Sequence, residues 1–249
     1  MSHELWQDRT VLLWGEDAVR AIRQARVLVV GVGGVGGFAV ETLVRAGIGE
    51  LGLADGDRVE ETNRNRQMAA LVTTTGQFKT DVLAARARDI HPDLRIRTFT
   101  RYFRPDTVRQ LFEGYRWDCV LDAIDTVAPK TALLLECVRR NIPVVSCMGA
   151  GARQDPESVK CADIARTTVC PLAKIIRTNL RNQGVTSGIT AVFSDESPVP
   201  GSIRHDTTSP DKRSVTGTVS YMPAVFGCHC AAAVLRILRN RAVSSEVRH

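Results

Sequence analysis

A buried strand that runs directly into a glycine-rich turn and a helix constrains the fold of this chain most. Residues Arg26–Gly31 read Arg-Val-Leu-Val-Val-Gly, which is typical of a short strand buried on both faces. Gly34–Gly47 follows with apolar residues at helical spacing. Because glycines let the backbone approach a phosphate and a helix N-terminus favours negative charge, the turn predicts a nucleotide site. Its glycines are Gly31, Gly33, Gly34 and Gly36.

Strand and helix patterns continue to alternate through the first 150 residues. We expect strands at Leu51–Asp55, Arg95–Phe99, Asp118–Asp122 and Pro143–Ser146, and helices at Phe78–Ile90 and Pro129–Asn141. Such alternation implies parallel strand–helix–strand units with right-handed crossovers. The expected fold class is α/β, a Rossmann-like and mostly parallel sheet with flanking helices. Ligands should bind at the carboxyl ends of its strands.

Beyond residue 150 the pattern is less regular, and we expect a C-terminal extension that continues the sheet and packs a final helix. The expected elements are strands at Val159–Ala165 and Gly188–Ser194, a helix at Pro171–Asn182 and a last helix from about Pro223 to Arg239. Residues 194–213 are rich in Ser, Pro, Asp and Thr, which predicts a mobile loop. The chain should form one domain, 1–249, with a nucleotide-binding part over 1–150 and a substrate part over 151–249.

The composition describes a soluble globular protein. Hydrophobic residues make up 44% and charged residues 24% of the chain, which excludes collagen-like, disordered and multi-span classes. Ser214–Leu235 contains no charged residue and is long enough to span a bilayer. Its first half is polar and loop-like, however, so a buried helix is the better interpretation and no membrane span is expected.

Cysteine usage favours a reducing compartment. The seven cysteines are odd in number, and the polar stretch Met1–Asp17 does not resemble a secretory leader, so a cytoplasmic location fits best. No Cys-x-x-Cys pair occurs, so no structural zinc is expected. Cys228-His229-Cys230 falls in a helical pattern, where such neighbours point apart.

The positive charge is concentrated in the second part of the chain. The formal net charge is +6, and residues 151–249 contribute 13 Lys and Arg against 8 Asp and Glu. Residues 1–150 are nearly balanced, with 20 against 19. Either an anionic partner meets the C-terminal part or the surface is simply solvated and rich in Arg.

Cations and amides follow the second strand in an order that suits a triphosphate. Asp55 ends that strand within reach of a ribose hydroxyl. The polar residues after it include Asp57, Asn63, Arg66, Gln67 and Lys79. A departing pyrophosphate needs such partners, whereas a dinucleotide does not. Asp125, in Asp122-Ala-Ile-Asp125, is placed for magnesium at a strand's carboxyl end. Alternatively, Arg66 and Lys79 are surface charges and Asp125 caps a helix.

Taken together, these motifs resemble the ThiF/MoeB/HesA family of adenylating enzymes. The resemblance covers Val27–Ala152 and includes the glycine loop, Asp-x-Asp, Asn-x-x-Arg-Gln and Ala-x-Asp motifs. It implies that these residues bind ATP and Mg²⁺, with Asp55 on the ribose and Asp125 on the metal. It also implies that Asn63, Arg66 and Lys79 contact the phosphates. Finally, it implies a homodimer in which an N-terminal arginine, for which Arg9 is the candidate, reaches the partner's ATP.

Motifs in the second part resemble one branch of that family, the tRNA threonylcarbamoyladenosine dehydratases. They include Met148–Arg153, Ala162-Asp163-Ile164, Pro171-Leu-Ala173, Val192-Phe-Ser194 and Gly217–Gly227. The resemblance implies ATP-dependent cyclisation of N6-threonylcarbamoyladenosine beside the anticodon of tRNA. The carboxylate of the modified base would be activated as an adenylate or acyl phosphate.

Other functions stay open at this point. In an activator of a sulfur-carrier or ubiquitin-like protein, a cysteine would accept the acyl group. The candidates are Cys147, Cys161, Cys170, Cys228 and Cys230, each of which also fits a buried structural thiol. Whether a sulfur-transfer protein is a partner stays open with either function. Arg66 and Lys79 disfavour an NAD oxidoreductase, and a non-catalytic nucleotide-binding module would need Asp125 to be dispensable.

Overall fold

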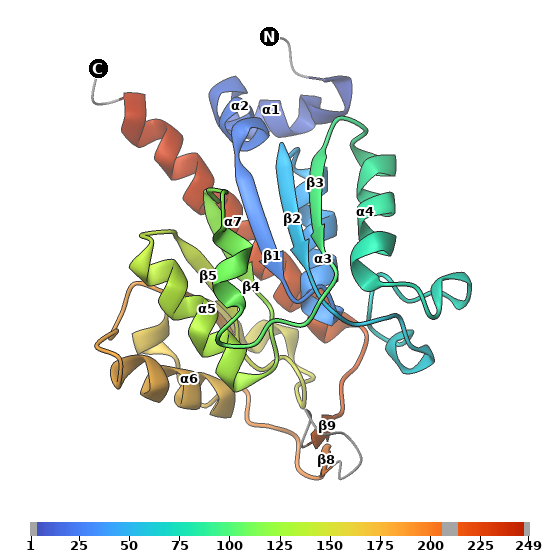
Figure 1. Cartoon of the computed structure of the whole chain (residues 1–249), viewed down its shortest axis with the longest axis vertical. Helices are drawn as coiled ribbons and strands as arrows, with labels where there is room; N and C mark the ends of the chain where they lie inside the picture. The colour runs from blue at the N-terminus through green and yellow to red at the C-terminus, as the bar shows by residue number, and fades with distance from the viewer. Residues whose placement is uncertain (1–3, 206–213, 247–249) are drawn as a thin grey trace.

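One seven-stranded sheet with helices on both faces organises the protein (Figure 1). The structure is a computed structural model and describes residues 4–205 and 214–246. The strand order is β3-β2-β1-β4-β5-β7-β6, parallel except for β6, which runs antiparallel to β7. The strands are β1 Arg26–Val30, β2 Glu50–Ala54, β3 Arg95–Phe99, β4 Cys119–Asp122, β5 Val144–Cys147, β6 Val159–Asp163 and β7 Thr190–Ser194.

Two hydrophobic cores lie on the two faces of the sheet. The helices are α1 Asp8–Trp14, α2 Glu16–Gln24, α3 Gly34–Arg45, α4 Lys79–Ile90, α5 Val127–Arg139, α6 Pro171–Arg181 and α7 Tyr221–Glu246. One core joins the sheet to α3, α4 and α7, and the other joins it to α5 and α6, which lie in front in Figure 1. Because both faces are covered, β2, β4 and β5 are buried along their whole length, as parallel strands usually are.

This architecture confirms the expected Rossmann-like α/β class and the extension of the sheet by the C-terminal part. The central order β3-β2-β1-β4-β5 is that of a doubly wound sheet, with β1 and β4 on either side of the point where the order reverses. Ligands of such folds bind at that point, outside the carboxyl ends of the strands.

Several expected boundaries are wrong. Helix α5 begins at Val127, so Pro129 is not its first residue, and α7 begins at Tyr221 and continues to Glu246. The loop expected at 194–213 contains β8 (Ile203–His205), which pairs antiparallel with β9 (Ser214–Thr216). The remainder of that expected loop, 206–213, lies outside the described residues. Helices α1 and α2 were not anticipated.

Helix α7 is the one described helix with the length and composition to cross a membrane, over Tyr221–Asn240. More than half of that window is buried inside the protein, and a core helix passes the same test. The helix packs so closely on α3 that a Cβ on Gly227 would lie only 2.6 Å from the carbonyl oxygen of Val35. Its contacts are therefore those of a core helix.

Candidate functional site

The glycine turn between β1 and α3 is built for close backbone approach. Gly31 has a φ of 84°, in the left-handed region that favours glycine. A Cβ on Gly36 would lie 1.8 Å from the Gly31 carbonyl oxygen, so no side chain fits there. The atom nearest to a Cβ on Gly33 would be the Gln67 amide nitrogen, at 3.6 Å. The turn thus brings α3's N-terminus, with its unpaired N–H groups, to the carboxyl end of β1, as an anion site requires.

Two backbone hydrogen bonds hold the carboxylate of Asp55 next to this turn. One carboxylate oxygen accepts a hydrogen bond from the Val32 N–H at 2.8 Å, and the other accepts one from the Asp57 N–H, also at 2.8 Å. Burial raises the pKa of Asp55, while the charge of Lys79 and the two N–H donors act in the opposite direction. The acid therefore occupies the position from which a carboxylate holds a ribose in this fold.

The carboxylate of Asp57 contacts two side chains, that of Lys79 and that of a tyrosine which the sequence analysis does not include. Lys79 is buried, and its Nζ lies 2.6 Å from Asp57 Oδ2. The Tyr102 hydroxyl donates to Asp57 Oδ1 at 2.8 Å, and this hydrogen bond raises the pKa of Tyr102 to about 12. Sequence reasoning missed Tyr102; the available signal was an aromatic residue just after β3, which neighbours β2 in the sheet.

The segment after Asp57 places its amides and Arg66 beside the glycine turn. Arg66 donates to the carbonyl oxygen of Thr62 at 2.9 Å and to Asn65 Oδ1 at 2.8 Å. Its own carbonyl oxygen would be 3.6 Å from a Cβ on Gly34. The Asn63 amide oxygen accepts from the Glu60 N–H at 3.2 Å, so Asn63 shapes this turn.

Gln67 carries an unsatisfied acceptor next to the turn. Its Oε1 is buried and has no hydrogen-bond partner among the described residues. Buried polar atoms normally have a partner, so an orphan acceptor beside Gly33 is best explained by a bound molecule or water that supplies a donor. This orphan acceptor beside the glycine turn fits a nucleotide.

The loop after β4 packs against the same glycine turn. A Cβ on Gly31 would lie 2.7 Å from the carbonyl oxygen of Ala123, which shows how closely the two loops pack. Behind them, Lys130 and Asp122 form a fully buried ion pair at 2.7 Å. Lys130 also donates to the carbonyl oxygens of Ile124 at 3.1 Å and Cys147 at 2.7 Å. This pair fixes the loop that carries Asp125.

Sequence reasoning also missed this pair as part of the site. A usable signal was present, because Lys130 shares one helical face with Leu133, Leu134 and Cys137, all of them buried. A lysine on the apolar face of a helix needs a buried carboxylate, and Asp122 is close in sequence.

Asp125 itself is exposed at the carboxyl end of β4. The described residues contain no cluster of three or more His, Cys, Asp or Glu side chains that could hold a metal ion. A protein-enclosed metal site therefore does not fit these residues. A single carboxylate does fit Mg²⁺ that arrives with a nucleotide, because such an ion keeps waters and phosphate oxygens as its other ligands.

Arg9 is not brought to this site within the chain. It is exposed on α1, at the opposite end of the strands (Figure 1). Gln7 packs against Gly47, which precedes β2, and the Trp6 ring lies 5.4 Å from that of His91, which precedes β3. Arg9 can thus contribute to a nucleotide site only in another copy of the chain.

The cysteines offer little to an acyl-transfer role. Cys147, Cys170 and Cys230 are buried, and Cys161 is partly buried. Cys228 is exposed on α7, where its thiol lies 3.9 Å from the Thr42 hydroxyl of α3.

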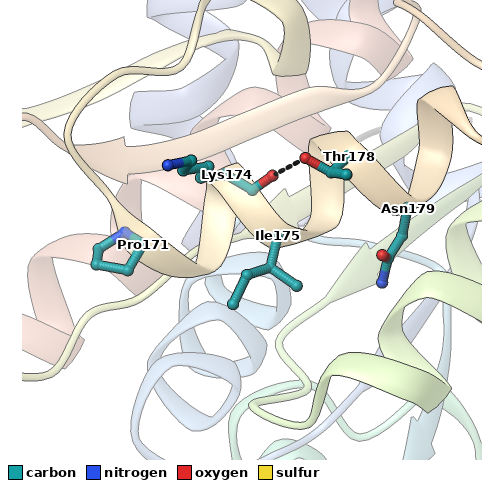
Figure 2. A pocket seen from close by; sticks show the side chains of 5 residues that line it. All are labelled: Pro171, Lys174, Ile175, Thr178 and Asn179. Atoms are coloured by element: carbon teal, nitrogen blue, oxygen red, sulfur yellow. Dashed lines mark hydrogen bonds between the residues drawn. The ribbon is translucent and has the colours of Figure 1, made fainter.

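A separate hollow of about 390 Å³ lies on α6 (Figure 2). Its lining residues all belong to that helix: Pro171, Lys174, Ile175, Thr178 and Asn179. None of them is a sequence-predicted site residue, and the Thr178 hydroxyl donates a hydrogen bond to the Lys174 carbonyl oxygen at 3.0 Å. The strand ends, and not this hollow, carry the features that a nucleotide site requires.

Several known proteins resemble this chain over most of its length. The ThiF family matches residues 7–248. The tRNA threonylcarbamoyladenosine dehydratase of Bacillus subtilis is 42% identical over 191 residues, covering 77% of this chain and 75% of the relative. The crystal structure of Escherichia coli TcdA, the dehydratase of the same name, in complex with ATP superposes with a TM-score of 0.86. Its sequence identity is 34%, over 98% of this chain and 99% of that one.

A more distant likeness concerns the fold alone. A structure of E. coli MccB superposes with a TM-score of 0.67 at 17% identity, over 96% of this chain and 65% of that one. The chain therefore belongs to the ThiF family, and within it to the branch of the tRNA threonylcarbamoyladenosine dehydratases.

Proposed function

We propose that this protein is an ATP-dependent dehydratase that cyclises N6-threonylcarbamoyladenosine next to the anticodon of tRNA. The observation that carries the proposal is the extent of the similarity, which runs through the nucleotide end and the C-terminal segments alike. A sulfur-carrier activator is less well supported, because three of the five candidate cysteines are buried.

The chemistry follows from the substrate's carboxylate, which is a poor electrophile. Its oxygen attacks a phosphorus atom of ATP and displaces pyrophosphate or ADP. A nucleophilic atom of the same side chain then attacks the activated carbonyl carbon, loses its proton and expels AMP or phosphate. Since this nucleophile is tethered, ring closure gains about 7–11 kcal/mol of effective-concentration advantage. No cysteine is needed, and the base loses one water in total.

The chain's own residues position the nucleotide for this step. Asp55 would hold the ribose, and the glycine turn would bind phosphate oxygens through backbone N–H groups. Lys79 and Arg66 would balance the charge that develops on the departing phosphates. Mg²⁺ held by Asp125 would neutralise phosphate charge as well. Arg9 of a second copy would complete the site in a homodimer.

The direct test is mass spectrometry of tRNA nucleosides after incubation with ATP and Mg²⁺. The proposal expects threonylcarbamoyladenosine to lose the mass of one water only when ATP is present. ATP–pyrophosphate exchange that depends on a carrier protein, without this mass change, would favour the sulfur-carrier activator instead.

We place tRNA on the C-terminal part, where the net positive charge lies, and expect its affinity to fall steeply between low and physiological salt. Affinity that does not change with salt would contradict this.

The homodimer is tested by mixing Arg9→Ala and Asp125→Ala chains. If Arg9 acts in trans, one site of each mixed dimer keeps both residues and activity partly returns. The free cysteines fit a reducing compartment, and we place the protein in the cytoplasm.

A further inference from the structure

Arg153 stands out among the cations of the described residues. Three of these have side chains that are at least nine-tenths buried, Lys79, Lys130 and Arg153. Lys79 pairs with Asp57 and Lys130 pairs with Asp122. Arg153 has no carboxylate within ion-pair distance among the described residues. Within the described part of the chain, its one hydrogen bond runs from Nη1 to the carbonyl oxygen of the preceding residue, at 3.2 Å, and its buried Nε has no partner there.

An unpaired buried cation is unfavourable, and an arginine cannot escape the cost by losing its proton. The fold nevertheless holds Arg153 firmly. Ala152 donates its N–H to the Gly217 carbonyl at 2.8 Å and accepts from the Val199 N–H at 3.0 Å. The Tyr221 hydroxyl donates to the carbonyl oxygen of Gln154 at 2.8 Å. Ala152 has a φ of 58°, a conformation that residues with a Cβ rarely adopt, so these contacts impose it.

The same contacts tie Arg153 to the nucleotide end. Residues 217–223, which hold its flanks, also reach the glycine turn and the segment after β2. Pro223 packs on Gly34, where a Cβ would lie 3.1 Å from the proline Cβ. The Asn65 amide donates to the Thr218 carbonyl oxygen at 3.4 Å. Arg153 therefore lies where the C-terminal part packs against the nucleotide end of the sheet.

We propose that Arg153 forms an anion-binding subsite and that its ligand is the free carboxylate of the modified nucleoside. This inference rests on the proposed function. A guanidinium matches a carboxylate through paired N–H donors. Since it stays protonated, it orients the carboxylate without transferring a proton to it, and the carboxylate remains ionised and able to attack phosphorus. The ligand would supply the counter-charge that the described residues do not provide for Arg153.

The test compares two tRNAs that differ only in the threonylcarbamoyl group on one adenosine. Binding to the full-length protein is measured at fixed salt, for the wild type and for Arg153→Gln. We expect Arg153→Gln to weaken binding of the modified tRNA by about tenfold or more and to leave the unmodified tRNA unaffected. Arg166→Gln, at an exposed arginine of the same part, is the matched control and should change both affinities by one factor.

A second readout separates ligand binding from a structural role. Removing a buried charge that no described carboxylate pairs should leave the melting temperature of free Arg153→Gln equal to or above that of the wild type. A lower melting temperature with unaltered discrimination between the two tRNAs overturns the proposal. Equal weakening of both tRNAs also overturns it, because the arginine would then contact backbone phosphate. Failure of the proposed function is distinguishable, since wild-type protein would then form no dehydrated nucleoside.

Discussion

Replacing Lys130 by methionine should measure how much the buried ion pair of Lys130 and Asp122 contributes to the stability of the fold. Lys130 and Asp122 are both 0% exposed and 2.7 Å apart. Methionine is similar in length and keeps the core filled. Among the described residues, however, Asp122 would keep as donors the Ser146 hydroxyl at 2.6 Å and the Ile124 N–H at 3.0 Å. The variant therefore isolates the loss of the counter-charge from the loss of packing.

Breaking a buried pair by removing one partner costs about 3–5 kcal/mol, because the other charge stays buried without compensation. That is a large part of the roughly 5–15 kcal/mol by which a typical domain is stable. Removing both charges is far less costly, since an apolar pair of similar volume is often neutral. We therefore expect Asp122→Leu combined with Lys130→Met to be more stable than either single variant, by about 2 kcal/mol or more.

The assay is urea unfolding of the wild type, the two single variants and the double variant, followed by circular dichroism. If a single variant does not fold, recovery of a cooperative transition in the double variant makes the same point. A cost below about 1 kcal/mol for Lys130→Met would refute the reasoning. A double variant that is no more stable than the more stable of the two single variants would also refute it.

Three further predictions concern the site and its surroundings. Asp125→Ala should abolish ATP-dependent loss of water from the nucleoside, and wild-type product at saturating tRNA and Mg²⁺ would contradict the assignment. Gly36→Ala should lose ATP binding in calorimetry, because its Cβ would lie 1.8 Å from the Gly31 carbonyl oxygen; unchanged affinity would argue against the turn. The pKa of Glu136 is lowered below 4.5, first by its hydrogen bond from Arg139. The resulting stability is present above pH 4.5 and lost as the pH falls through the folded-state pKa. Melting temperatures should therefore be lower for Glu136→Gln than for the wild type at pH 7, and the two should converge as the pH falls through the folded-state pKa of Glu136; a gap independent of pH would contradict this.

The sequence predicts those parts of the site that depend on local order. Asp55 ends a buried strand and the glycines begin a helix, and the structure brings the Asp55 carboxylate to the Val32 N–H within this turn. Tyr102 could not be predicted in the same way. Its hydroxyl meets Asp57, 45 residues away, only because β3 pairs with β2. The partner of such a residue depends on strand order, which a local pattern does not contain.

The predicted boundaries of helix α5 and of the loop at 194–213 were wrong for a related reason. Proline suits the first turn of a helix, and this preference predicts a start at Pro129. The helix begins two residues earlier, at Val127, and Pro129 still falls within the first turn, where its missing N–H is tolerated. Residues 194–213 are polar enough for a loop, but Ile203–His205 finds a partner in β9, beyond the end of the expected loop.

The fold alone cannot determine which carboxylate such a protein activates. The doubly wound sheet and its strand-end site are an architecture that many proteins use for unrelated tasks. In this chain the distinguishing residues must therefore lie where the C-terminal part meets the nucleotide end. The structure identifies that meeting place through Pro223 on Gly34 and the hydrogen bond between Ala152 and Gly217. A substitution in these segments should alter the choice of substrate more than the affinity for ATP, whereas a change in the glycine turn should do the reverse.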